Sequence, residues 1–515
     1  MHYLYVNDMP NNGGNLLAHI LPIEIWQLIL SYCSFWDFMR FRQTCKRGQK
    51  LPIPDLPSCY SSECSANHFK KLNDTVIKQL NGLQNFTYKI HRKITIPVHL
   101  LTNLTRLKII GYNSDSIKMK NQQCLKIGKL TQLKELEIFD YNPTIKYFTD
   151  LKALTKLALY GFCSVLENEL KMMTNLLSLD IARLKADFTN LDTLQKLTFL
   201  SVPSCMQNSE INKLTNLLDL KLFCFYYRTT DLNGLSKLTR LKTYSHSLAI
   251  TNNSVRNLTN LKVLSASLIT DFNSMIQLTK LKVLRSSNVF GDFVFNEFAF
   301  QNLTNLVDLK IIDHPKIKKI KNISHLTSLK HLTLVHTEVQ TEELQGLTNL
   351  ESLKVVAFPL KSIGPLTRLT SLKANYINND LVFLRNLEFL GEFDDAIDLN
   401  RFTKLTKLDF RQPKVNRSFK ERIYTNIVDL VFWWGDDYSY LDCFPNLTSL
   451  NIEPYCNKQI LNHVTNLHKL KILKGVHSYL FHGLLGLKNL ERIDFTPESS
   501  KFEEVFKGKF HVKYN

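Results

Sequence analysis

A short apolar phrase returns through most of the chain at intervals of about 21 residues. One copy consists of Leu101, Leu104, Leu107 and Ile109. A fixed period over hundreds of residues is the signature of stacked structural repeats, so it constrains the fold more than any other feature. The copies begin at positions 101, 130, 151, 173, 194, 214, 235, 258, 278, 303, 326, 347, 366, 384, 402, 424, 444, 464 and 487, and a further copy precedes them at Leu80, Leu83, Phe86 and Tyr88.

The last two apolar residues of each copy are separated by one residue, which places both on the same side of a short strand. One such strand is too small to bury them, but stacked copies align them into continuous buried ridges. Amphipathic helices with leucines at i and i+3 are the alternative, and their pattern would drift with a 3.6-residue period. We therefore predict an α+β chain in which a curved solenoid over residues 80–515 carries a parallel β-sheet on its concave face.

The repeat resembles the short class of the leucine-rich-repeat family over residues 80–515. That family usually has Asn or Cys three positions after the second strand leucine, where the side chain satisfies backbone groups of the turn. Asn is absent from this position in the first seven copies and Cys occurs there once, so we expect aromatic packing in place of an asparagine ladder. The residues at this position in these copies are Tyr112, Tyr141, Phe162, Leu184, Cys205, Phe225 and His246.

Residues 19–58 have a different pattern, with apolar residues at helical spacing. Pro22 suits the first turn of a helix, Glu24 suits the positive end of its dipole, and a second helix is predicted from about Asp37. The segment resembles an F-box, which binds the adaptor of SCF-type ubiquitin ligases, although Gly48 stands where that family often has Trp. The matching residues are Leu21-Pro22-x-Glu24-Ile25, Ile29-Leu30, Asp37-Phe38 and Cys45-Lys46-Arg47.

The F-box resemblance implies a Skp-type adaptor as partner, with a cullin bound through that adaptor. We expect four segments in the chain: a polar tail at 1–18, the F-box at 19–58, a linker at 59–79 and the repeat solenoid at 80–515. The residues implied to bind the adaptor are Leu21, Pro22, Glu24, Ile25, Ile29, Leu30, Phe38 and Cys45.

A second candidate surface is the column of residues between the last two apolar positions of each copy, which point away from the core. From Lys221 to Lys373 this column contains six basic residues and no acidic one. Such a stripe suits an acidic or phosphorylated target protein, because Lys and Arg form charge-assisted bonds to anionic groups. A solvated face without a ligand is the alternative. The predicted target-binding residues are Lys221, Phe223, Arg240, Lys242, Tyr244, Arg285, Lys310, Lys354 and Lys373.

The chain contains 65 Lys and Arg residues against 46 Asp and Glu, a formal net charge of +19. A basic excess is typical of nucleic-acid binding. Here, however, it is spread through repeated Leu-Thr-x-Leu-Lys phrases, and no basic arm or tail is present. We therefore favour a protein target over a nucleic acid, whose binding would fall steeply as salt rises.

No catalytic motif is present: the sequence has no nucleophile elbow, phosphate-binding loop or zinc-protease motif. Cys59, Cys64 and His68 offer three zinc ligands without a fourth. We therefore expect neither an enzyme nor a cofactor. The absence of an apolar run of 18 residues and of a signal at Met1–Asn15 predicts no membrane span and reduced cysteines. A cytoplasmic or nuclear location follows, in a host cell if the source is a virus or an intracellular bacterium.

Two functional interpretations follow from these features. The first is a substrate-recognition subunit of an SCF-type (cullin–RING) ubiquitin ligase, in which the F-box binds the adaptor and the repeats bind the target. The alternative is a leucine-rich-repeat interaction scaffold unrelated to ubiquitin, whose N-terminal helices only cap the solenoid. The scaffold predicts that partner binding survives deletion of residues 1–58.

Overall fold

The repeats form short parallel strands joined by tight turns, as the sequence pattern predicts. This fold is seen in a computed structural model, and the chain divides into two compact units, residues 1–224 and 225–515. The structure describes residues 84–89, 98–110, 127–139, 150–160, 167–182, 184, 191–203, 211–223, 228–229, 231–244, 248–269, 272–287, 299–313, 319–356, 358, 360, 362–374, 381, 383–391, 398–411, 417–433, 438–452, 458–476, 484, 487, 489–495 and 511–514.

In the first unit the described strands form a parallel sheet in which each strand pairs with the next along the chain. They are β1 (Asn85–Lys89), β2 (Arg106–Ile110), β3 (Glu135–Phe139), β4 (Lys156–Tyr160), β5 (Ser178–Asp180), β6 (Phe199–Pro203) and β7 (Asp219–Phe223). Short helices connect several of them: η2 (Val98–Leu100), η3 (Ile127–Lys129), α7 (Glu167–Leu170) and η5 (Leu191–Thr193).

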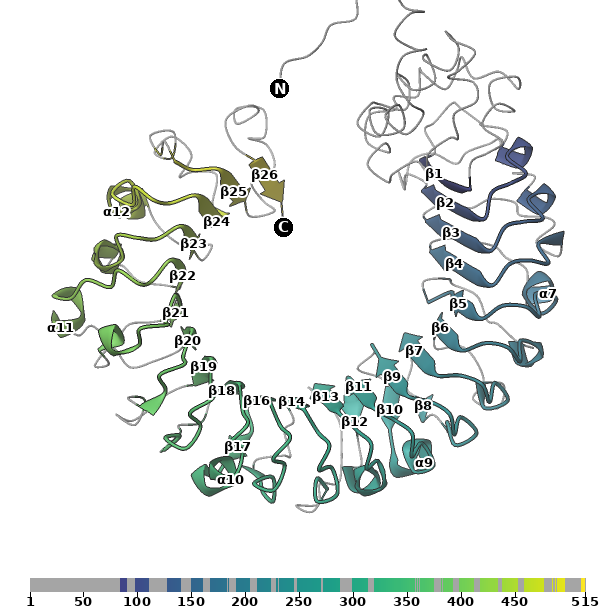
Figure 1. The fold of residues 1–515 in the computed structure, drawn as a ribbon, viewed down its shortest axis with the longest axis horizontal. Coiled ribbons are helices and arrows are strands. Elements are labelled where there is room, and N and C mark those ends of the chain that lie inside the picture. Colours follow the sequence, from purple (N-terminus) through teal and green to yellow (C-terminus); the bar gives the residue numbers. More distant parts are fainter. Residues whose placement is uncertain are drawn as a thin grey trace, which may run out of the picture. The chain divides into compact units, whose positions relative to one another are not determined.

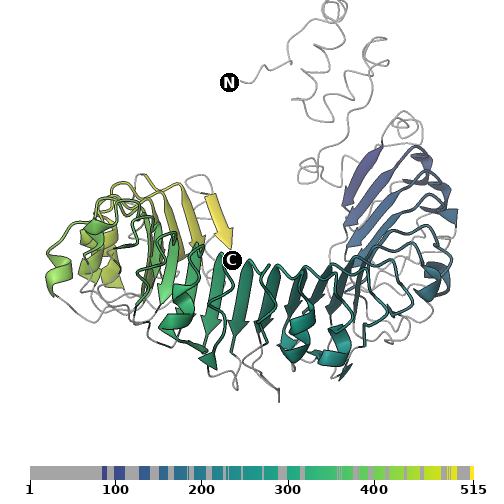
Figure 2. The same cartoon turned by 60° about the horizontal axis from the view of Figure 1, so that its bottom comes forward.

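The second unit repeats the same arrangement in a longer parallel sheet. Its strands are β9 (Arg240–Thr243), β11 (Val263–Ala266), β13 (Val283–Ser287), β14 (Asp308–Ile312), β16 (His331–Val335), β18 (Ser352–Val356), β19 (Ser371–Ala374), β20 (Phe389–Gly391), β21 (Lys407–Arg411), β22 (Asp429–Trp433), β23 (Ser449–Ile452), β24 (Ile472–Val476), β25 (Arg492–Phe495) and β26 (His511–Tyr514). Within each unit the strands line the inner side of a curve, and the helices lie on its outer side (Figures 1 and 2).

Short outer elements complete the second unit. Two small parallel sheets lie outside the main one: β8 (Arg228–Thr229), β10 (Leu248–Ile250) and β12 (Leu268–Ile269) form the first, and β15 (Lys319–Ile320) and β17 (Glu338–Val339) form the second. The helices are α9 (Asn252–Val255), η6 (Phe272–Gln277), α10 (Thr341–Gln345), η8 (Leu399–Arg401), α11 (Arg417–Lys420), η9 (Tyr438–Cys443), η10 (Lys458–Ile460) and α12 (Leu461–Val464).

Each repeat closes through backbone hydrogen bonds that explain the spacing of its leucines. The amide of Leu104 donates to the carbonyl of Leu101, three residues earlier, at 3.1 Å. The amides of Thr105 and Arg106 then both donate to the carbonyl of Gln84 in the preceding repeat, at 2.8 and 3.0 Å. A tight turn followed by a two-pronged link to the neighbouring repeat therefore recurs along the chain. Stacking in this way satisfies backbone groups that a single repeat would leave unpaired.

The core is a set of leucine rows that run across the strands. Leu104 and Ile109 are fully buried, and their equivalents in the following repeats are buried to the same degree. The pairing of Leu107 with Leu136, and of Leu136 with Leu157, keeps each row in register from strand to strand. The prediction of a repeat solenoid with a parallel sheet on its inner face is confirmed.

One repeat lies three residues further along than its sequence pattern indicates. Leu473 pairs with Leu450 in the sheet, so the repeat that we placed at Val464 begins at Leu467. Val464 imitates a repeat leucine because it is buried at the end of α12. The final apolar position is also shifted, to Val476, by an irregularity at Gly475, whose φ of 73° favours glycine.

Asparagine side chains form a ladder at another position of the repeat than the family pattern gives, and the aromatic packing expected after the strand stays a prediction. The ladder lies in the Leu-Thr-Asn-Leu turn, not after the strand. The amide of Asn216 donates to the carbonyl of Gln195 at 2.9 Å, and that of Asn349 donates to Thr327 at 2.8 Å. Of the seven residues expected to pack in its place, Leu184 is buried, and the other six lie outside the described residues.

Candidate functional site

The predicted column is an in-register row of side chains in each unit. In the first unit the row, here called the unit-1 row, runs across neighbouring strands through Lys108, Glu137, Ala158, Asp180, Ser201 and Lys221. In the second, the unit-2 row consists of Lys242, Ser265, Arg285, Lys310, Thr333, Lys354, Lys373, Gly391, Asp409, Val431, Asn451, Lys474 and Asp494. Lys474 takes the place that the sequence pattern assigns to Lys471, because of the shifted repeat.

Opposite charges compensate one another in the unit-1 row and beside it. Lys156 Nζ lies 2.8 Å from Glu137 Oε1, and Lys108 Nζ lies 3.7 Å from Glu137 Oε2. Arg106 and Glu135 extend this network at 3.2 Å. Partial burial opposes ionisation of Glu137, but the hydrogen bond and charge of Lys156 together with Lys108 outweigh it and lower the pKa of the carboxyl. These lysines are therefore already engaged by acidic neighbours.

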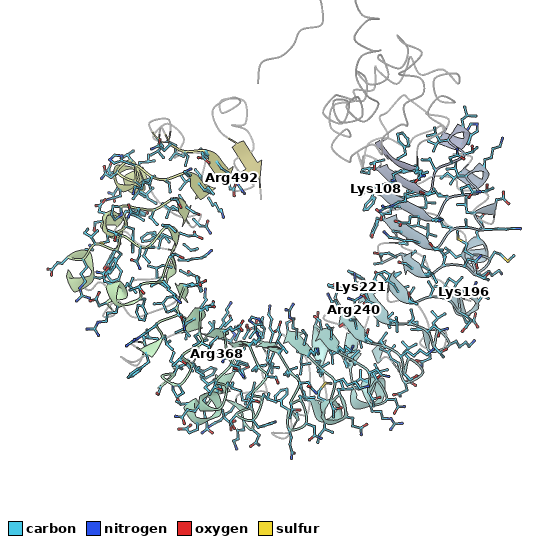
Figure 3. The ribbon with its side chains drawn as sticks, viewed as in Figure 1. Lys108, Lys196, Lys221, Arg240, Arg368 and Arg492 are labelled. Carbon is cyan, nitrogen blue, oxygen red and sulfur yellow. The ribbon has the colours of Figure 1, made fainter. Side chains whose placement is uncertain are left out.

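Aromatic rings border the same face of the first unit. The ring of Phe139 stacks on that of Tyr160 with centroids 4.4 Å apart, and the Tyr160 hydroxyl donates to Asp180 at 2.8 Å. Lys221 Nζ lies 4.9 Å from the centroid of the Phe199 ring, a cation–π contact. Figure 3 shows Lys108 and Lys221 on the inner side of their strands. Phe223 is half-buried at the end of β7.

The second unit holds the remaining predicted target-binding residues, on β9 to β19. Arg240 is exposed on β9 (Figure 3), Lys242 is half-buried, and Tyr244 is 51% exposed just after the strand. Lys310 and Lys354 are half-buried in the unit-2 row. All five belong to the inner face that the repeat pattern predicts.

Two predicted cations of the unit-2 row form ion pairs within the sheet. Arg285 Nε lies 3.1 Å from Asp308 Oδ2, and the guanidinium remains largely exposed. Lys373 pairs with Asp409, and only 11% and 8% of the two side chains are exposed. Lys373 therefore lies within the sheet, and its charge is balanced there. Further along, Lys407 pairs with Asp429 at 2.8 Å and Arg492 pairs with Asp494 at 2.7 Å.

Many lysines of the turns have a structural role that the sequence interpretation missed. Lys196 donates to Asn175 Oδ1, Lys280 to Asn260 and Lys404 to Asn386, at 2.8, 2.6 and 2.8 Å. Each asparagine thus accepts from a basic residue at the same position of the next repeat. The sequence feature that could have revealed this role is the alternation of Leu-Thr-Asn-Leu with Leu-Thr-Lys-Leu phrases, as at 258–261 and 278–281. Part of the excess positive charge therefore comes from turn lysines that donate to the asparagines of the ladder.

The predicted adaptor-binding residues and the cluster of Cys59, Cys64 and His68 lie outside the described residues. Across the residues that the structure does describe, no group of three or more His, Cys, Asp or Glu side chains could hold a metal ion. No helix in that part of the chain has the length and apolarity required to cross a membrane.

Comparison with known families identifies the N-terminal segment. Residues 19–47 match the F-box domain, within the segment where the sequence predicts one. The chain therefore carries an F-box domain, as expected, followed by the parallel-strand repeat solenoid described above. An F-box domain suggests a role in binding an SCF adaptor. No curated protein matches the chain.

Solved leucine-rich-repeat structures resemble the repeats at low sequence identity. A leucine-rich-repeat protein of Leptospira interrogans is 19% identical and aligns over 86% of this chain and 98% of its own, with a TM-score of 0.43. An internalin of Listeria monocytogenes is 19% identical over 63% of this chain and 92% of its own, at 0.42. The Arabidopsis receptor kinase HAESA ectodomain, solved with an IDA peptide hormone, is 15% identical over 82% and 76%, at 0.47.

Proposed function

We propose that the protein is a substrate-recognition subunit of an SCF-type (cullin–RING) ubiquitin ligase. The observation that carries the proposal is the F-box at residues 19–47, which precedes a repeat solenoid in the same chain. The F-box binds a Skp-type adaptor and through it the cullin, and the inner strand face binds the target protein. The chain contributes proximity between target and ligase, so it needs no catalytic residue of its own.

The adaptor surface is proposed to consist of the eight predicted residues of the F-box. Apolar side chains dominate this set, as in many stable protein interfaces, whose cores are depleted of charge. Glu24 is the acidic member, and its place near the start of the predicted first helix suits the helix dipole. The set is Leu21, Pro22, Glu24, Ile25, Ile29, Leu30, Phe38 and Cys45.

Co-purification of the full chain with a purified Skp-type adaptor tests the proposal. We expect wild-type protein to co-elute with the adaptor in size-exclusion chromatography and the double variant Leu21→Asp/Pro22→Asp to lose it. Lys310→Glu, which alters the unit-2 row alone, is the matched control and should retain the adaptor. A wild-type chain that captures no adaptor contradicts the ligase function and favours the interaction scaffold.

A further inference from the structure

Two cations in the stretch of the unit-2 row from Lys242 to Lys373 have no partner among the residues that the structure describes. Lys242 on β9 and Lys310 on β14 make neither a hydrogen bond nor an ion pair there, whereas Arg285 between them pairs with Asp308. Both lysines are half-buried. An anionic ligand therefore gains more at these two positions than at the paired cations of the same face.

The spacing of the two lysines is set by the sheet. Lys242 pairs with Ser265, Ser265 with Arg285 and Arg285 with Lys310, so three strand-to-strand steps separate them. At about 4.8 Å per step the two positions are roughly 14 Å apart. An extended peptide advances about 3.3 Å per residue, so residues i and i+4 lie about 13 Å apart and on the same face of the peptide.

The residues between the two lysines restrict what the ligand carries in its middle. Ser265 is small and uncharged, and Arg285 is balanced by Asp308. A third anionic group at i+2 would find no unpaired cation in the row and would lie close to the Asp308 carboxylate. A continuous polyanion such as a nucleic acid is disfavoured for the same reason. Two separated anionic groups fit the row best.

The chemistry of each position favours a carboxylate over a phosphate. Each anionic group would meet one unpaired lysine of the row, which is a single point charge. A phosphate carries nearly two charges and is usually recognised by several donors or by an arginine fork. Lys262 and Lys282 are exposed at the starts of β11 and β13, and they add a positive field that speeds the approach of an acidic segment.

We infer that the target presents an extended segment with two acidic residues, Asp or Glu, four residues apart, whose carboxylates bind Lys242 and Lys310. This inference rests on the proposed function for the identity of the ligand as a ligase target. The binding itself is independent of the adaptor, so the two are tested separately. The inference narrows the set of predicted target-binding residues from nine to two, Lys242 and Lys310.

Synthetic peptides and the full-length protein test the spacing. The probe is a fluorescent Gly/Ser peptide with Glu-x-x-x-Glu, compared in fluorescence anisotropy with Glu-x-x-Glu and Glu-Glu peptides of equal charge. We expect at least about fivefold tighter binding at the i, i+4 spacing, because the other spacings leave one lysine unpaired. Carbodiimide coupling followed by mass spectrometry should join that peptide to Lys242 and Lys310. Equal affinity for all three peptides, or coupling mainly to other lysines, overturns the inference.

Variants and competing ligands complete the test. Lys242→Glu and Lys310→Glu should each lower affinity about tenfold, while Lys152→Glu, at an exposed turn lysine of the first unit, should leave it unchanged. Two competing ligands are a phosphoserine peptide of the same spacing and single-stranded DNA of equal charge. If either binds tenfold tighter than the Glu peptide, the inference that the ligand groups are carboxylates is overturned. If the protein binds the peptide but does not capture the adaptor, the ligase function alone is contradicted. Adaptor capture without peptide binding contradicts this inference alone.

Discussion

Lys373 and Asp409 form an ion pair across an intervening strand. Lys373 lies on β19 and Asp409 on β21, and the residue between them in register is Gly391 of β20. The lysine reaches over this strand because glycine has no side chain. Both charged groups are largely buried, so the pair depends on the absence of a single Cβ atom. The register of three strands thus determines which charges of the unit-2 row are available to a ligand.

Substitution of Gly391 should weaken this arrangement. A Cβ atom at this position would lie 3.2 Å from Asp409 Cβ and 3.3 Å from both Lys373 Cγ and Phe389 Cζ, tighter than ordinary contact. We expect Gly391→Ala to lower the free energy of unfolding by about 1–3 kcal/mol, measured by urea denaturation. Gly364→Ala is the matched control, because its Cβ would meet only the Phe383 ring at 3.5 Å. Equal effects of the two substitutions would contradict the explanation.

Removal of one partner of the pair should cost more than removal of both. Asp409→Leu leaves the buried ammonium of Lys373 uncompensated, and we expect a loss of about 3–5 kcal/mol in unfolding free energy. The double variant Lys373→Met/Asp409→Leu replaces both charges with apolar groups and should recover most of that loss. A double-mutant cycle in urea measures the coupling. Additive effects of the single and double substitutions would show that the pair is not coupled.

The turn ladder should contribute to stability through Asn386. Its amide donates to the carbonyl of Thr367 at 3.1 Å, and its oxygen accepts from Lys404 at 2.8 Å. We expect Asn386→Ala to lower the free energy of unfolding by about 1 kcal/mol, because the Thr367 carbonyl loses its donor. Lys404→Ala removes only the exposed second bond and should cost less than half as much. If both variants match wild type, the ladder has no role in stability.

The repeat made most of this fold predictable, because a buried leucine every 21 residues permits few alternatives. Lys242, Arg285, Lys310 and Lys354 could be placed in one row from spacing alone. Their ion pairs could not, because the Arg285–Asp308 contact depends on which strands are neighbours and on side-chain reach. Lys373 was assigned to the ligand face for the same reason. Its column position was evident from the sequence, but its burial depends on Gly391 one strand away and on Asp409 two strands away.

The network around Glu137 should make the stability of the first unit depend on pH. The pKa of Glu137 is lowered from its usual value: burial raises it, but Lys156 and Lys108 lower it by more. A carboxyl with a lowered folded-state pKa stabilises the fold above its unfolded pKa, and this contribution is lost as pH falls through the folded value. We therefore expect Glu137→Gln to lower Tm at pH 6, with the difference from wild type shrinking towards pH 3. Glu421→Gln, at an exposed position without a partner among the described residues, is the control and should follow the wild-type profile. A difference between Glu137→Gln and wild type that stays constant from pH 6 to pH 3 would rule out this origin of the stabilisation.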